Sequence, residues 1–454
     1  MRRIETINET ILIIILCVTR GPISLEGGSM NNQWSASATP VQNGSRLFDP
    51  FDVDTYKQAF QDFNALCIED KKKYKGVEEY ITQKTGIVCT PLNQNYKKLH
   101  EEIISRLSNP LAIEPLVIDT VFQRDLIINL LSSLENENYI KEIYKCKKKK
   151  VKNGLNTEEA SILLDCLRQG HSLLQAGQKA ELLAKPLIDF YAASAYAYAI
   201  IVVNSPLHKS IKTLKGSHGH TYNHKDGVIE FGGNIPSGTF LDLMASIPLA
   251  QIIDQNTKIN YSLLPSLDFV QKNYVKIPLE ALLSMIPELR DSYKRVDSQH
   301  CMTHQVKLDY ENNNGKTIYN FFVGDGIDKP DREKLERSFN TSSIIEMQGS
   351  FKVSVKSSAL PDIMPNIYHD AKGQLWYIES PIDGLVIPEI CLHFLTISAL
   401  CNIMRYSPHE WNMIISNRIS STSSLLIHEY ISLFELKFPM LVVEMLTNYL
   451  PTLQ

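Results

Sequence analysis

The segment covering residues 184–240 constrains the fold more than any other part of the chain. It begins with a run rich in alanine and tyrosine, residues 186–203, and continues into a histidine-containing loop and a Gly/Pro-rich stretch. Pro186 suits the first turn of a helix. The small side chains allow neighbouring helices to approach closely, while Tyr191, Tyr196 and Tyr198 add bulk with a polar tip. This pattern predicts a central packing helix that ends near Val203.

Two further segments have an unbroken helical period. Residues 157–183 place apolar side chains at helical spacing, and Glu158 and Glu159 favour the positive end of the helix dipole. We expect Thr157 to cap this helix. Residues 386–404 repeat apolar side chains every three or four positions and predict a second long helix. Nearer the C-terminus, residues 420–424 suggest a Ser/Thr linker, and Pro439 suggests the start of a last helix.

A region with a strand-like residue pattern separates these helical regions. Alternating or β-branched stretches predict four strands, with a hairpin turn at residues 312–315 between the first two; the strands are residues 305–310, 317–323, 351–356 and 375–378. The sequence therefore predicts an α+β fold that is predominantly helical, with a small antiparallel β-rich insertion.

The same changes in texture divide the chain into five parts. Residues 1–29 read as a leader or vector-derived segment, and residues 31–45 as a polar, mobile stretch. The remaining parts are an N-terminal helical region (30–150), a central helical region with the His-rich loop (151–294), the β-rich insertion (295–380) and a C-terminal helical region that packs on the central one (381–454).

The composition limits the class of protein and the compartment that we expect. Of 454 residues 44% are hydrophobic and 21% are charged, which is ordinary for a globular protein. A net charge of -4 gives no overall attraction to nucleic acid or to an anionic membrane. The apolar run at residues 11–18 is far shorter than the roughly 20 residues that span a bilayer. The eight cysteines contain no Cys-x-x-Cys pair, as in reduced cytosolic proteins. We expect a cytoplasmic protein with no membrane partner.

Several short motifs follow one another along the chain. At these positions the chain resembles the bacterial YaaC-like family; the motifs are Lys185-Pro186-Leu187 with Tyr191, Ser217-His218-Gly219, Gly238-Thr239-Phe240, Ile286-Pro287-Glu288-Leu289, Arg405-Tyr406-Ser407-Pro408 with Trp411, and Lys437-Phe438-Pro439. The resemblance implies a mainly helical, cytosolic bacterial protein and brings no established activity. The chain departs from the family pattern at Asp189-Phe190 and at His220.

The loop after the central helix carries His218, His220 and His224 within seven residues. Three imidazoles at this density suggest a divalent metal site, which His300, Cys301 or His304 would complete. The metallo-hydrolase pattern His-x-His-x-Asp-His fails, however, because Tyr222 and Asn223 occupy its last two places. A histidine in such a loop can instead serve as a general base, and most loop histidines are structural. We take His218 and His220 as candidate catalytic residues and expect no cofactor, with a divalent metal as the alternative.

Five other residues are candidate ligand contacts: Lys185, Tyr191, Ser217, Arg405 and Trp411. A site is expected where residues 217–224 meet the helix at residues 185–198, with Arg405 as a further contributor. Its mixed polar and aromatic lining would suit a flat or phosphorylated ligand. Arginine and tryptophan also anchor protein interfaces.

Two functional classes remain after these comparisons. The chain contains no phosphate-binding loop, no dinucleotide fingerprint and no nucleophile elbow. The first class is a non-catalytic interaction or regulatory subunit of a bacterial complex, with phage defence as a setting, which binds a protein partner or itself. The alternative is a nuclease or another hydrolase that uses the His-rich loop, with nucleic acid as a candidate substrate.

Overall fold

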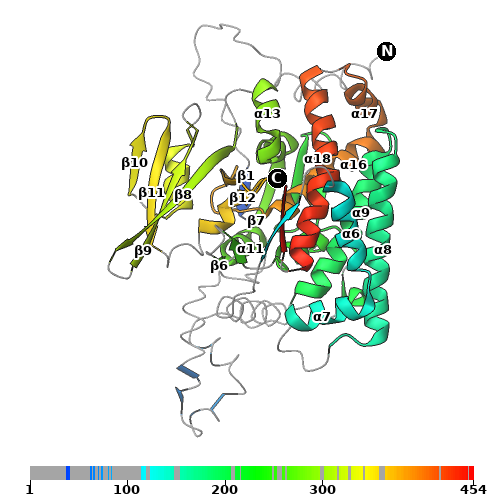
Figure 1. The fold of residues 1–454 in the computed structure, drawn as a ribbon, viewed down its shortest axis with the longest axis horizontal. Coiled ribbons are helices and arrows are strands. Elements are labelled where there is room, and N and C mark those ends of the chain that lie inside the picture. The colour runs from blue at the N-terminus through cyan, green and yellow to red at the C-terminus, as the bar shows by residue number, and fades with distance from the viewer. Residues whose placement is uncertain are drawn as a thin grey trace.

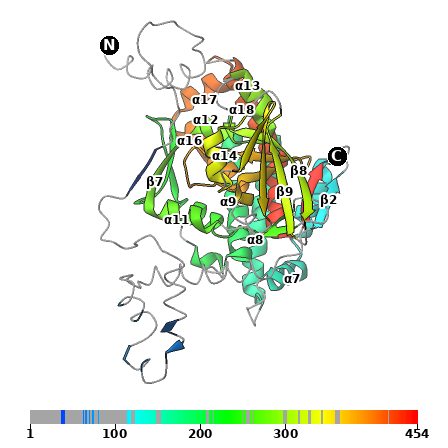
Figure 2. The same ribbon diagram turned by 90° about the vertical axis from the view of Figure 1, so that its left-hand side faces the viewer.

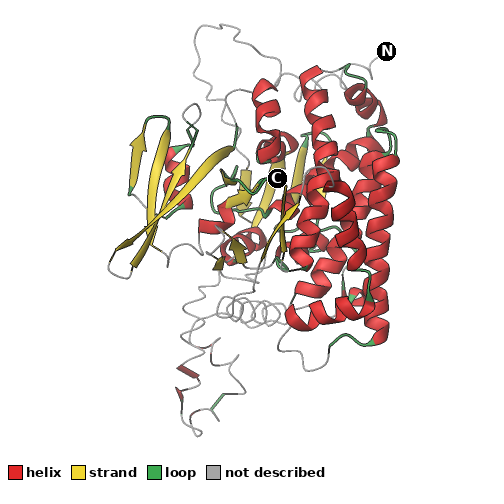
Figure 3. Ribbon diagram, viewed as in Figure 1, coloured by secondary structure: helices red, strands yellow, loops and turns green. Residues whose placement is uncertain are grey.

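Helices form one side of the molecule, and two larger antiparallel sheets and two strand pairs complete its described part (Figures 1 and 3). The predicted α+β class, mostly helical with antiparallel strands, is confirmed. The computed structural model describes residues 114–118, 123–147, 154–205, 210–214, 216–247, 250–252, 258–260, 263–296, 301–313, 316–325, 329–340, 343–356, 363–418, 421–447 and 449–453, together with residues 37–40 and short stretches between 62 and 83. The expected leader (1–29) and most of the expected N-terminal helical region (30–150) lie outside these ranges.

The helical part is built around α9 (Lys185–Asn204), which packs against α8 (Thr157–Lys179), α16 (Glu389–Tyr406) and α18 (Ser421–Leu446). Shorter helices cover this group: α6 (Gln123–Ser133), α7 (Glu137–Lys147), α10 (Thr239–Met244) and α17 (Pro408–Ile415). The alanines of α9 are fully or almost fully buried, as the packing argument requires. Among the described residues, α9 is the single helix long and apolar enough to cross a membrane, and the bent pair of α16 and α17 passes the same test only when the two are taken together. However, 78% of the apolar window of α9 is buried inside the fold, as in the core helix of a soluble protein.

The start of α8 differs from the expected cap. Asn156, and not Thr157, occupies the cap position, so that prediction is wrong by one residue. The Asn156 side chain accepts a hydrogen bond from the Glu159 backbone N–H at 2.8 Å, and the Glu159 carboxylate accepts one from the Asn156 N–H at 3.0 Å. This reciprocal pair satisfies two backbone donors at once. Asparagine and threonine are both good caps, and the position of Glu159 three residues onward selects Asn156.

The region expected to be a helix and a loop contains a four-stranded sheet. Its order is β1 (Ser37–Pro40), β7 (Asn273–Pro278), β4 (Val228–Gly232) and β3 (His220–Asn223), all antiparallel. The expected mobile stretch at residues 31–45 thus contributes an edge strand, and the histidine loop leads into another. These strands are short, and β4 and β7 carry only two or three core-facing residues each, so their alternation is a weak signal in the sequence. The two-stranded pair β5 (Ala250–Ile252) and β6 (Lys258–Asn260) and the helix α11 (Leu264–Lys272) follow in this region.

The β-rich insertion forms its own sheet and core. The strand order is β10 (Ile344–Met347), β11 (Ser350–Lys356), β9 (Lys316–Val323), β8 (Thr303–Asn313), β13 (Leu375–Ile378) and β12 (Ile367–His369), and α14 (Arg332–Ser338) accompanies it. The expected hairpin is confirmed by the pairing of Asn313 with Lys316. In the turned view β8 and β9 lie in front of the helices, while β7 lies to one side (Figure 2). Phe321, Val323 and Leu335 form part of the separate hydrophobic core of this sheet.

Beyond β7 the chain forms α12 (Leu279–Ser284), α13 (Arg290–Val296) and short 3-10 turns at Pro287–Leu289 and Met364–Asn366, and a further 3-10 turn at Ile211–Thr213 lies between α9 and β3. The expected linker at 420–424 and the expected helix start at Pro439 are both wrong, because α18 is one helix with Pro439 inside it. An interior proline costs about 3 kcal/mol. Phe434, Phe438 and Val442 are fully buried on the same helix, and each such side chain contributes about 1.5–3 kcal/mol. The burial of these side chains therefore offsets the cost of the proline. After α18, the strand β14 (Tyr449–Leu453) pairs in parallel with β2 (Glu114–Ile118).

Candidate functional site

The histidine loop is held by close contact between two backbone segments. The backbone N–H groups of Thr239 and Phe240 donate hydrogen bonds to the carbonyls of Ser217 and His218, at 3.0 and 2.9 Å. Gly219 adopts a φ of 79°, and a Cβ atom on Gly238 would lie 2.2 Å from the Ser217 carbonyl oxygen. Only glycine avoids that clash. The motifs Ser217-His218-Gly219 and Gly238-Thr239-Phe240 are therefore two halves of one structural unit.

His220 is part of the core. Its Nε2 lies 2.7 Å from the Ser398 hydroxyl on α16, and its Nδ1 lies 3.2 Å from the His218 carbonyl oxygen. Burial, followed by the effect of His218, lowers the pKa of His220 to about 4. The imidazole is therefore neutral at pH 7 and fixed between β3 and α16. These contacts are those of a structural histidine.

His218 is the half-buried member of the group. Its ring meets Phe190 of α9 edge-on, with 5.0 Å between ring centroids. Its Nδ1 makes no hydrogen bond within the part of the chain that the structure describes. Burial and the positive charge of Arg405 lower the pKa of His218. A neutral ring with an unused nitrogen has the chemistry of a general base.

His224 contacts the end of α16. Its Nδ1 lies 3.4 Å from the Ser407 hydroxyl, and its ring packs edge-on against Tyr222 and Tyr406. Burial lowers the pKa of His224, and the nearby Glu410 opposes that shift. Among the residues with described positions, no group of three or more His, Cys, Asp or Glu side chains could hold a metal ion. His300, a candidate fourth ligand, lies outside those residues.

A surface patch lies at the end of α16, and we call it the α9–α16 surface. It comprises Tyr191, His218, His224, Arg405 and Tyr406. The Arg405 guanidinium lies 4.9 Å from the centre of the Tyr406 ring. Tyr406 is 61% exposed and Tyr191 is 47% exposed. The structure therefore brings the predicted residues Arg405 and His218 together at the end of α16, while Tyr191 adjoins them through its neighbour Phe190.

The other predicted ligand contacts use their polar atoms inside the fold. Lys185 forms an ion pair with Glu435 of α18. The Ser217 hydroxyl donates to the Ser237 carbonyl at 3.0 Å. Trp411 is 0% exposed, and its indole N–H donates to the Leu183 carbonyl at 3.1 Å. Trp411 therefore closes the core between α17 and the start of α9, and its ring does not reach the α9–α16 surface.

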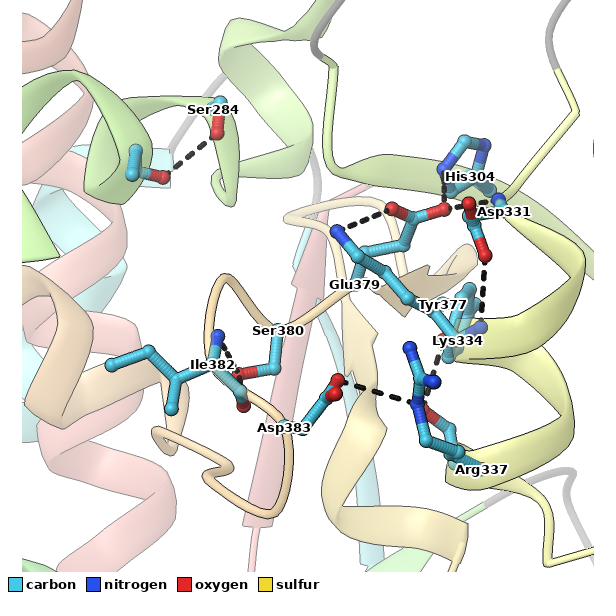
Figure 4. Close-up of polar contacts among 12 residues, drawn as sticks. Ser284, His304, Asp331, Lys334, Arg337, Tyr377, Glu379, Ser380, Ile382 and Asp383 are labelled. Carbon is cyan, nitrogen blue, oxygen red and sulfur yellow. Dashed lines mark hydrogen bonds and ion pairs between the residues drawn. The ribbon is translucent and has the colours of Figure 1, made fainter. Parts of the chain in front are cut away.

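His304, another suggested metal ligand, belongs to a polar cluster in the β-rich insertion (Figure 4). Its Nε2 lies 3.2 Å from a carboxylate oxygen of Glu379. The same carboxylate accepts a hydrogen bond from the Asp331 backbone N–H at 2.6 Å and contacts Lys334 at 3.3 Å. Burial would raise the pKa of Glu379, but His304, Lys334 and the Asp331 N–H together lower it. This cluster fastens α14 to the sheet.

Two buried ionisable sites are not predicted by the sequence. Asp189, where the chain departs from the family pattern, is fully buried on α9. Lys437 and Glu288, which lie in two of the short motifs, meet as a buried ion pair at 3.1 Å. The available signal was a charged residue within a strongly apolar run, as at Lys437 in α18.

The fold and these contacts define an α+β protein with a buried Ala/Tyr helix at its centre. A model of the YaaC-like protein family matches residues 130–446, which is most of the chain. The chain therefore belongs to the YaaC-like family. No curated protein and no solved structure matches it.

The two histidines of the loop should respond differently to replacement. His220→Ala leaves the Ser398 hydroxyl without its partner and opens a cavity, so we expect it to lower the free energy of unfolding by about 2–4 kcal/mol. His218→Ala removes a half-buried ring whose Nδ1 makes no hydrogen bond within the described residues, and should cost about 1 kcal/mol or less. Denaturant unfolding of both variants measures the difference. Equal losses would contradict the assignment of His220 to the core.

Proposed function

We propose that this protein is a non-catalytic interaction subunit whose α9–α16 surface docks a protein partner that presents a carboxylate. The observation that carries the proposal is the exposed stack of Arg405 on Tyr406. The exposed Arg405 side chain hydrogen-bonds the Cys401 thiol. None of the ion pairs found among the described residues includes Arg405, so we infer that a partner carboxylate can meet its charge. The setting we propose is a cytosolic complex of a bacterial cell, with phage defence as one such setting.

The composition of this surface supports a protein partner. Arginine and tyrosine are enriched among residues that dominate binding energy, because both give large contact areas with a polar tip. Tyr191 adds a second exposed ring near the same patch. The two helices α16 and α17 meet at an angle of 115° directly after Tyr406, so the bend presents the stacked pair at a corner. Neighbouring His218 and His224 add neutral hydrogen-bonding groups.

A hydrolase, and a nuclease in particular, is the second candidate function. One observation favours it: His218 is a half-buried histidine with a lowered pKa and an unused Nδ1 beside Arg405. In this reading His218 would act as a general base, and Arg405 would contact a phosphate. His220 is held by Ser398, so the candidate depends on His218 alone.

A photoreactive phenylalanine analogue in place of Tyr406, introduced into the full chain in cells, tests the docking proposal. We expect a discrete cross-linked species from position 406 and a weaker one from position 191. Arg405→Glu should abolish both because it reverses the charge that a partner carboxylate meets. Tyr310, which is 58% exposed on the distant β-rich insertion, is the matched control position and should give no such species.

Mass measurement and nucleic-acid incubation separate the two candidates. If the cross-link joins two copies of the chain, light scattering will report a dimer that Arg405→Glu dissociates. Equal labelling from positions 406 and 310 would reject the docking surface. Cleavage of RNA or DNA by the purified protein, lost in His218→Ala, would establish the hydrolase instead.

A further inference from the structure

The first strand in the order of the six-stranded sheet, β10, forms one edge of that sheet. Among the described strands it pairs only with β11. Figure 1 shows it at the outer edge of the molecule, on the side away from the helices. An edge strand presents backbone N–H and C=O groups that can hydrogen-bond to a further strand. The edge at β10 can therefore accept another β-strand.

The side chains of β10 do not block this edge. The strand reads Ile344-Ile345-Glu346-Met347 and contains no lysine and no proline, the residues that commonly protect a sheet edge. Ile345 is 60% exposed and Met347 is 44% exposed. Both lie on the face of the sheet opposite to the one where Ile344 meets Val353 in the core. A second strand at this edge would cover these two apolar side chains in part.

Glu346 is the single charged residue of β10, and its charge is already paired. Its carboxylate lies 2.5 Å from the Lys329 ammonium group, which also lies 5.8 Å from the centre of the Phe351 ring. A charged side chain at a sheet edge discourages pairing with a second strand. Because the ion pair has no net charge, Lys329 removes much of that repulsion.

The opposite edge of the same sheet, formed by β12, is covered by the helical part. Ile367 and Tyr368 of β12 are buried. The His369 carbonyl accepts a hydrogen bond from Lys437 of α18 at 2.5 Å, and the Tyr368 hydroxyl donates to the Ile387 carbonyl before α16. A sheet with one open edge can join one other sheet, so pairing through it closes at two copies and does not continue into a filament.

We propose that the chain forms a symmetric dimer in which β10 pairs antiparallel with β10 of a second copy. The two six-stranded sheets then join into one across a two-fold axis. This contact lies outside the α9–α16 surface, so the inference does not depend on the proposed function.

Charge and side-chain direction select the register of this pair. Residues directly opposite each other in an antiparallel pair have side chains on the same face, so a two-fold axis places one residue opposite its own copy. An axis at Glu346 would oppose two like charges, which is destabilising. An axis at Ile345 places the two Ile345 side chains together and sets each Glu346 opposite Ile344 of the second copy.

A second copy fits this edge because one strand then satisfies both sides of the contact. The axis at Ile345 leaves both exposed apolar faces on the same side of the joined sheet. Each Ile345 gains an apolar neighbour, and each Met347 lies diagonal to Ile345 of the second copy, within reach of a long side chain. The two copies make identical hydrogen bonds, as an isologous interface requires.

Sedimentation velocity of the full chain over a series of concentrations tests the proposal. We expect the mass to rise from that of one chain to that of two. The affinity should be weak, because the contact is smaller than the about 800 Å² per partner of a standard interface. Ile345→Lys and Met347→Lys should each raise the dissociation constant by about tenfold or more. Both side chains are exposed, so both variants should fold like the wild type.

Hydrogen exchange tests whether backbone pairing holds the dimer. Amides of a peptide that contains residues 344–347 should exchange more slowly at high protein concentration, and Ile345→Lys should remove this difference. Tyr310 is 58% exposed on β8 of the same sheet, and Tyr310→Lys should leave the dissociation constant unchanged. Arg405→Glu on the α9–α16 surface should also leave it unchanged, which separates this dimer from the proposed docking function.

Three results would overturn the dimer. The first is a chain that stays monomeric at the highest concentration at which it is soluble. The second is a dimer that keeps its dissociation constant in both Ile345→Lys and Met347→Lys. The third is assembly that continues beyond two copies, because a single open edge cannot produce it.

Discussion

Lys437→Met is expected to lower the free energy of unfolding by about 3–5 kcal/mol near pH 8. The methionine fills a similar volume, but Glu288 and Glu389 lose the buried cation that lies 3.1 and 3.2 Å from them. A buried charge without a partner destabilises the fold, because no ion pair then offsets the free-energy cost of removing that charge from water. Urea unfolding of the wild type and the variant measures the loss.

The loss in Lys437→Met should depend on pH in one direction. Burial already raises the pKa of Glu389 to about 8, and loss of the lysine, which opposes that shift, raises this pKa further above its value in the unfolded chain. A carboxyl with a raised folded pKa binds a proton on folding, so the stability deficit shrinks toward pH 5 and grows as pH rises. Adding Glu389→Gln to the variant should recover part of the loss. Lys212→Met, which breaks an exposed ion pair with Glu158, should leave the midpoint almost unchanged. A deficit that is the same at pH 5 and pH 8 would contradict this account.

Asp189→Asn should flatten the pH dependence of stability. Asp189 is fully buried on α9, and neither carboxylate oxygen makes a hydrogen bond within the described residues. Its Oδ1 packs so closely on α8 that a Cβ on Gly177 would lie 2.2 Å away. Burial, with a smaller contribution from Glu435, raises the pKa of Asp189 to about 8, and Lys185 opposes this only partly.

The sign follows from the raised pKa. The folded protein keeps Asp189 protonated, while the unfolded chain ionises it above its ordinary pKa near 4, so stability is lost as pH rises toward 8. At about 1.4 kcal/mol per pH unit, the wild type should lose roughly 4 kcal/mol more than Asp189→Asn between pH 5 and pH 8. Thermal and denaturant unfolding across this range measures the slope. Asp165→Asn on the exposed face of α8 changes the net charge equally and should keep the wild-type slope. Parallel curves for the wild type and Asp189→Asn would show that Asp189 is ionised in the fold.

The α9–α16 surface shows how far the sequence can locate a candidate site. The expectation that Arg405 lies near the histidine loop agrees with the structure, because Arg405 acts on His218. The sequence could not show which of the three histidines is structural. That role depends on Ser398 of α16, which is 178 residues away from His220. The same holds for Trp411, whose partner Leu183 is 228 residues away.

The sequence by itself determined the class of the fold and three of its four long helices. The 3.6-residue period predicted α8, α9 and α16 because a helix buries one face along many residues, which repeats the signal. The β8–β9 hairpin was predicted for a similar reason, since strand pattern and turn composition agree. The family resemblance rested on short motifs that the structure joins in pairs, such as Glu288 with Lys437.

Only the tertiary structure decided the remaining features. The sheet β1-β7-β4-β3 pairs strands from residues 37 to 278 that are too short for a clear alternation. Burial of Phe434, Phe438 and Val442 carries α18 through Pro439, where local propensity predicts a break. In the sequence, Asp189, Glu389 and Lys437 cannot be told apart from ordinary charged surface residues. Their chemistry arises from desolvation and from neighbours distant in sequence, and only the folded chain provides both.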